Sequence, residues 1–92
     1  MAVLVTMQVG PVDWSKFKSA LDWSTPFRPP QRLTSHVYRS QGDSSQVLIV
    51  ERWLSHEAMH EYQEKYGDEF NKRAGTEGLQ WQTGVWELAE SF

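Results

Sequence analysis

The four consecutive apolar residues at 47–50 constrain the fold of this chain more than any other feature. Alternate side chains of a strand point to opposite faces, so Val47 and Ile49 lie on one side of a sheet. Leu48 and Val50 lie on the other side. Both faces are therefore apolar, and neither can be left to water. The sequence predicts a strand within a sheet whose two faces are both covered.

The rest of the chain divides into elements that can build such a sheet. Asp13 can cap a helix that Pro26 ends, and Ser55 can cap a second helix that ends near Gly75. We predict strands at 2–9, 32–40, 46–54 and 79–88, a helix at 14–24 between the first two, and the Ser55 helix before the last. This β-α-β-β-α-β order is that of the ferredoxin-like split βαβ. It is an α+β fold with a four-stranded antiparallel sheet and both helices on one face.

The sheet face away from the helices needs a second cover. The second helix packs through its apolar stripe on the same sheet face as the first helix. This stripe consists of Met59, Tyr62, Tyr66 and Phe70. On a lone small domain, the face with Leu48 and Val50 would then be an exposed apolar patch, and such patches mark interfaces. We therefore predict a homodimer that forms through this face.

The composition is that of one small folded domain spanning residues 1–92. Of these 92 residues 13% are aromatic, with five tryptophans, which is enough for a substantial core. With 9 Lys+Arg against 12 Asp+Glu there is no basic stripe, so nucleic acid is not predicted as a partner. The chain has no cysteine, and no segment has the length of a signal peptide core or a membrane span. We predict a cytoplasmic protein with no membrane partner.

Residues 56–60, His-Glu-Ala-Met-His, match the H-E-x-x-H pattern of zinc proteases. Two histidines four apart share a helix face, so both could reach one Zn²⁺ while Glu57 served as general base. A catalytic zinc needs a third protein ligand, but Gln63 stands three residues after His60 and no histidine follows. The pattern also lies in the first turn of its helix, where the dipole disfavours a cation. We predict no metal site.

Several segments resemble the antibiotic biosynthesis monooxygenase family of the dimeric α+β barrel superfamily, across nearly the whole chain. The matching parts are the first strand, the turn at Gly10-Pro11, the strand at 33–39 and, above all, Glu51-x-Trp53 followed by Ser55-x-Glu57-Ala58. The resemblance implies a dimeric α+β barrel and, for some members, oxygenation of polycyclic phenols without a cofactor. The superfamily also includes isomerases, cyclases, haem-degrading enzymes and proteins of no known activity.

The chain departs from the pattern of the cofactor-free oxygenases at two places. Those enzymes carry an Asn on the third strand and a Tyr early in the next helix, where this chain has Ile49 and Met59. Neither side chain can hold a phenolate or a peroxide as an amide can. The haem-degrading branch has a His ligand late in the second helix, where this chain has Lys72 and Arg73. Neither haem nor any other cofactor is predicted.

We expect the remaining chemistry in a cavity between sheet and helices. Glu51 is the first candidate for a catalytic base or proton donor; in the alternative it only pairs with Arg32, Arg39 or Arg52. His36 is a second candidate base, by analogy with barrel cyclases, although alternation places it toward the dimer face. The expected ligand-binding residues are Trp53, Ser35, Ile49, Met59, Tyr62, Tyr66, Trp14 and Trp81.

These features predict a protein that binds a small, flat, mostly apolar aromatic molecule. The leading hypothesis is oxygenation of a quinol- or phenol-like substrate without a cofactor. Two alternatives stand beside it. One is a cyclase or isomerase that moves a proton with His36, Glu51 or a tyrosine. The other is a binding module without catalytic activity.

Overall fold

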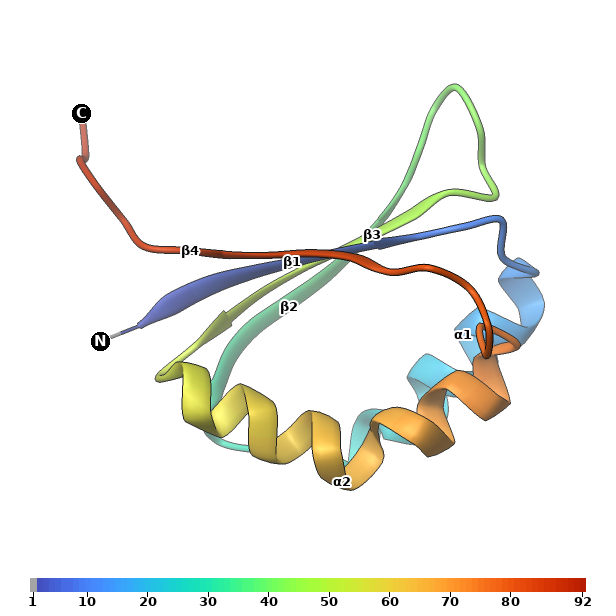
Figure 1. Ribbon diagram of the computed structural model, residues 1–92, viewed down its shortest axis with the longest axis horizontal. Coiled ribbons are helices and arrows are strands. Elements are labelled where there is room, and N and C mark those ends of the chain that lie inside the picture. Colours follow the sequence, from blue (N-terminus) through green and yellow to red (C-terminus); the bar gives the residue numbers. More distant parts are fainter. Residues whose placement is uncertain (1) are drawn as a thin grey trace.

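A computed structural model describes residues 2–92 of the chain. Its elements follow the β-α-β-β-α-β order, with one short 3-10 helix after the first helix (Figure 1). In chain order they are β1 (Val3–Val9), α1 (Trp14–Ser24), η1 (Thr25–Phe27), β2 (Arg32–Arg39), β3 (Val47–Trp53), α2 (His56–Ala74) and β4 (Gln82–Trp86). Within this described part, neither helix is long and apolar enough to cross a membrane.

The four strands form one antiparallel sheet in the order β2-β3-β1-β4. Strand β3 lies between β2 and β1, and β1 also pairs with β4. In Figure 1 both helices lie on the same side of this sheet, below it in the view. The predicted ferredoxin-like α+β fold is therefore confirmed, with the helices covering one face of the sheet.

The helices begin and end at the residues that the sequence indicated. The Asp13 carboxylate accepts hydrogen bonds from two backbone N–H groups in the first turn of α1. At the start of α2, the Ser55 hydroxyl accepts from the backbone N–H of Ala58 at 3.1 Å. Gly75 follows α2 with φ 71°, a left-handed conformation that favours glycine. The Asp13 cap explains why α1 begins at Trp14, as predicted, and the other two caps set the ends of α2.

Two segments differ from the prediction. The last strand is shorter than the predicted 79–88, because β4 hydrogen-bonds only to β1 and their register runs from Leu4 to Gln8. The residues after α1 form the 3-10 helix η1, which was not among the predicted elements. Pro26 suits the first turn of this helix, since no N–H is needed there.

The two faces of the sheet differ in how well they are covered. On the helix side, the core side chains are buried, and Trp53 is fully buried. The opposite face carries Leu48 and Val50, both half-buried, with Tyr38 54% exposed and Trp86 56% exposed. No helix within residues 2–92 packs on this second face. It is the face through which the sequence predicts a homodimer.

Candidate functional site

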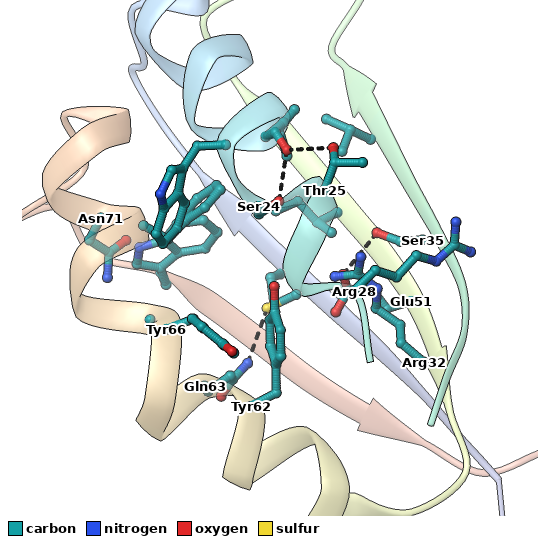
Figure 2. Close-up of a pocket in the computed structure, with 18 of the residues that line it drawn as sticks. Ser24, Thr25, Arg28, Arg32, Ser35, Glu51, Tyr62, Gln63, Tyr66 and Asn71 are labelled. Carbon is teal, nitrogen blue, oxygen red and sulfur yellow. Dashed lines mark hydrogen bonds and ion pairs between the residues drawn. The ribbon is translucent and has the colours of Figure 1, made fainter. Parts of the chain in front are cut away.

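A cavity of about 560 Å³ lies between the helices and the sheet (Figure 2). Its size falls within the usual range for small-molecule sites. The apolar part of its wall includes Met7, Leu21, Val37, Ile49, Phe70 and Trp81. The polar part includes Arg32, Ser35, Glu51, Tyr62, Tyr66 and Asn71. A cavity that combines aromatic and aliphatic side chains with hydrogen-bonding groups is suited to an aromatic molecule that carries oxygen substituents.

Glu51 is the buried acidic group of this cavity, with its side chain only 8% exposed. Ser35 Oγ donates a hydrogen bond to its Oε2 at 2.8 Å, and Arg32 Nη1 donates to the same oxygen at 3.3 Å. Trp53 Nε1 donates to Oε1 at 3.0 Å. A buried carboxylate is tolerated only when it is paired and hydrogen-bonded, and these donors meet that need. They also occupy both oxygens of the group.

Arg32 reaches the cavity because of a β-bulge in β2. Regular alternation would put Arg32 on the same face as Thr34, away from the helices. The pairing of β2 with β3 shifts between Arg32 and Thr34, so that Arg32 lies opposite Trp53. Its side chain is 11% exposed, and its Nε, which is buried, has no hydrogen-bond partner among residues 2–92.

Two tyrosines of α2 form the wall opposite the sheet, as Figure 2 shows. The Tyr62 ring lies 5.6 Å from the Trp53 ring and 5.0 Å from the Tyr66 ring, measured between centroids. The Arg32 guanidinium lies 5.5 Å from the Tyr62 ring centroid. Burial raises the pKa of the Tyr62 hydroxyl, and the nearby positive charge of Arg32 partly opposes that rise. Tyr62 is therefore a neutral hydrogen-bond donor at physiological pH.

The structure brings most of the predicted site residues to this cavity. Those that line it are Ser35, Ile49, Glu51, Tyr62, Tyr66 and Trp81. Ile49 lies on the same face of β3 as Glu51, since the two are separated by one pleat pair. Of the two candidate proton-transfer groups, only Glu51 is among these residues.

The other predicted site residues lie outside the cavity wall. Trp53 and Met59 pack with Val3 and Val5 in a separate core cluster. Trp53 does not line the cavity, and contacts the site through its bond to Glu51 and through the Tyr62 ring. Trp14 is half-buried and packs below Arg39, whose guanidinium is 4.5 Å from its ring centroid. His36 pairs with Val50 on the open face of the sheet and is exposed.

The wall also includes residues that were not among the predicted site residues. Trp23, Arg28 and Arg32 are among them. The 3-10 helix places Phe27 so that its ring stacks on Tyr66 at 5.1 Å and meets Trp23 edge-on at 5.2 Å. These contacts fix the edge of the cavity next to α1. The cluster of aromatic and proline residues at 23–27 was the available sequence signal.

The two histidines of the H-E-x-x-H pattern lie on the exposed side of α2. The His56 and His60 rings are 4.3 Å apart, as expected for residues one turn apart on one helix face. Both residues are exposed, and Glu57 between them is exposed as well. Among residues 2–92, no group of three or more His, Asp or Glu side chains is arranged to hold a metal ion. Neither the two histidines nor Glu57 lines the cavity.

Comparison with known proteins identifies the fold. No protein-family model matches this sequence, and no curated protein does either. Among solved structures, SnoaB, a cofactor-independent oxygenase from Streptomyces nogalater, is similar, with a TM-score of 0.72 and 16% identity over 98% of this chain and 94% of that one. A proposed antibiotic biosynthesis monooxygenase from Bordetella bronchiseptica has a TM-score of 0.74 and 14% identity over 98% of this chain and 100% of that one. A similarly assigned protein from Deinococcus radiodurans has a TM-score of 0.68 and 13% identity over 98% and 95%. This chain therefore has the fold of the antibiotic biosynthesis monooxygenases over nearly its whole length.

Proposed function

We propose that this protein binds a small, flat, mostly apolar aromatic molecule in the cavity between sheet and helices, and oxygenates it without a cofactor. The observation that carries the proposal is the cavity of about 560 Å³, in which aromatic walls surround one buried cluster of polar groups. The similarity in fold to a cofactor-independent oxygenase supports the same reaction class. The substrate class is a phenol or quinol, whose ring fits the apolar walls and whose oxygen meets the polar cluster.

Oxygenation without a cofactor requires the substrate to supply the electrons. Anthrone, whose enol form is a phenol, illustrates the balance. Its CH₂ carbon reacts with O₂ to become C=O, and the second oxygen atom leaves as water with the two hydrogens. The protein would bind the substrate, keep bulk water out, and stabilise negative charge as it develops on the phenolic oxygen. Arg32 and Tyr62 are the donors in the cavity for that last task.

We also propose that the protein is a homodimer. The open face of the sheet carries half-buried Leu48 and Val50 beside the exposed rings of Tyr38 and Trp86. A second copy of the same face would bury these side chains. The pair of sheets would then form the barrel-like core implied by the superfamily resemblance.

Proton transfer without oxygen is a second candidate reaction. It is favoured by the apolar side chain of Ile49, which lines the cavity next to Glu51 and cannot stabilise a peroxide. A cyclase or isomerase would need only a proton donor and a proton acceptor, and the Tyr62 hydroxyl provides the donor.

Oxygen uptake separates these functions. With anthrone as substrate, we expect one O₂ consumed for each anthraquinone formed, at a rate above that without protein. The cavity-filling variant Ile49→Phe should lower this rate, whereas Leu54→Phe, at a half-exposed residue after β3, should not. Product formed without oxygen would favour the cyclase or isomerase. Ligand binding without any turnover would favour a binding module.

A further inference from the structure

The polar cluster of the cavity has more hydrogen-bond donors than acceptors. Arginine carries five N–H groups. Of those of Arg32, Nη1 donates to Glu51, and the buried Nε has no partner among residues 2–92. Nε is closed off from the cavity, so a ligand would meet the outer N–H groups of the guanidinium, which is part of the cavity wall. The Tyr62 hydroxyl is a further donor on the opposite wall.

Glu51 is poorly placed to act as a base. Both of its oxygens already accept hydrogen bonds from Arg32, Ser35 and Trp53, so neither is free to take a proton from a ligand. A carboxylate held in this way fixes the position of the guanidinium beside it. The hydrogen bond to Glu51 uses one N–H of Arg32, so the other N–H groups of the guanidinium do not bond to Glu51.

We propose that Arg32 and Tyr62 form a subsite for an anionic oxygen of the ligand, and that Glu51 is the positioning residue that holds Arg32 there. This inference rests on the proposed function, because it assumes an aromatic ligand in the cavity. It narrows the substrate class to molecules with an acidic hydroxyl, such as an enol or a hydroxyquinone, that bind as the anion. The aromatic walls hold the ring, and the Arg32 guanidinium and Tyr62 hydroxyl face the charged oxygen.

The charge at the cavity mouth does not select the ligand. Arg28 and Asp68 both line the cavity and are both exposed, so their charges are screened by solvent. The buried Arg32 acts in a less polar environment, where a hydrogen bond to a charged group is stronger. Selectivity for an anion therefore depends on Arg32.

A matched pair of ligands tests the subsite without any turnover. Lawsone is a hydroxynaphthoquinone that is ionised at neutral pH, and its methyl ether has nearly the same shape but cannot ionise. Their affinities can be measured by quenching of tryptophan fluorescence. The wild-type protein should bind lawsone at least about tenfold more tightly than the ether, since a charge-assisted hydrogen bond is worth about that much.

Variants assign this preference to the residues. Arg32→Gln should reduce the affinity ratio to about one, whereas Arg39→Gln, on the same strand but outside this cavity, should leave it unchanged. Glu51→Gln should reduce the preference for lawsone in part, because Arg32 keeps its charge but loses the carboxylate that positions it; an unchanged preference would overturn the positioning role of Glu51. If Arg32→Gln alone does not fold, because Glu51 is then buried without its cation, the double variant Arg32→Gln/Glu51→Gln restores neutrality and should also lose the preference.

The outcomes distinguish the subsite from the function on which it rests. Equal binding of both ligands by the wild-type protein would overturn the subsite and leave the aromatic cavity in place. A preference for lawsone that persists in the folded Arg32 variants would also overturn it. If neither ligand binds, the aromatic-binding proposal fails, and the subsite fails with it.

Discussion

At the scale of single residues, the site is organised around one buried charge. The Glu51 carboxylate links β2, through Arg32 and Ser35, to the core of the sheet, through Trp53. Motif resemblance singled out the Glu51-x-Trp53 pair, and the structure shows a physical reason for it. The indole N–H supplies the hydrogen bond that a buried carboxylate requires, so Trp53 acts on the cavity through Glu51 rather than as its wall.

This role of Trp53 predicts the effect of two substitutions on stability. Trp53→Phe keeps most of the packing but removes the bond to Glu51, and should lower the free energy of unfolding by about 1–3 kcal/mol. Trp53→Ala also leaves a cavity, and should cost about 3–5 kcal/mol. Urea unfolding measures both. As a control, Lys18→Ala removes the exposed ion pair with Asp22 on α1 and should cost less. An equal cost for Trp53→Phe and Lys18→Ala would contradict the role of Trp53.

The buried hydroxyl of Tyr62 predicts a pH dependence. Its pKa in the folded protein is raised above that in the unfolded chain, so the folded state holds the proton more tightly. The stability gained from this difference is complete below the unfolded tyrosine pKa of about 10, and is lost as pH rises through the higher folded pKa. The urea midpoint of the wild-type protein should therefore fall more steeply above about pH 10 than that of Tyr62→Phe. Parallel curves would show that Tyr62 does not contribute.

At the scale of the elements, caps and periodicity predicted most of the fold. They did not predict its local backbone irregularities. Asp13, Ser55 and Gly75 fixed the helix ends because each makes a local interaction that a sequence shows directly. The bulge near Arg32 and the 3-10 helix at 25–27 were not predicted, because each depends on pairing or packing with distant residues. Both place residues in the cavity wall, so the site was predicted less completely than the fold.

Gly67 within α2 and Gly75 directly after it predict opposite effects of substitution by alanine. Gly67 lies inside the helix with open space around an added Cβ, so Gly67→Ala should stabilise the protein by about 0.5–1 kcal/mol. Gly75 has φ 71°, so Gly75→Ala should destabilise it by about 1 kcal/mol. Thermal unfolding of the two variants measures both effects. Changes of the same sign would contradict the C-cap assigned to Gly75.

The exposed histidines of α2 predict that the protein holds no stoichiometric zinc. Elemental analysis of the purified protein should find far less than one Zn per chain, and a chelator should not change its melting temperature. A full equivalent of zinc that is lost in His60→Ala would overturn this prediction. The control Gln41→Ala, in the hairpin loop, should not change the metal content.

At the scale of the whole molecule, the two faces of the sheet differ, because the helices cover one face and leave the other open. The helix-covered face holds the cavity, and the open face holds half-buried Leu48 and Val50. The four consecutive apolar residues of β3 predicted that both faces of the sheet carry apolar side chains. The sequence predicts that the open face is covered. The contacts of a partner with this face could not be predicted, because local sequence patterns describe the elements of one chain.

The proposed dimer predicts that a charge on the open face weakens assembly. Val50→Asp would bury an unpaired carboxylate at the interface, and should cost several kcal/mol and produce monomers or unfolded chains. Gln41→Asp, which adds the same charge to the exposed hairpin loop, should remain dimeric. Light scattering at micromolar concentration gives the mass of each. A wild-type monomer would contradict the dimer.

The central claim is that the space between α1, α2 and the sheet is a binding site for a flat aromatic molecule. A crystal structure of the protein grown with lawsone tests it most directly. We predict that the naphthoquinone ring lies between Ile49 and the α2 tyrosines, with its charged oxygen within hydrogen-bond distance of Arg32. A structure with the ligand on the open face of the sheet, and no ligand beside Glu51 and Tyr62, would contradict the claim.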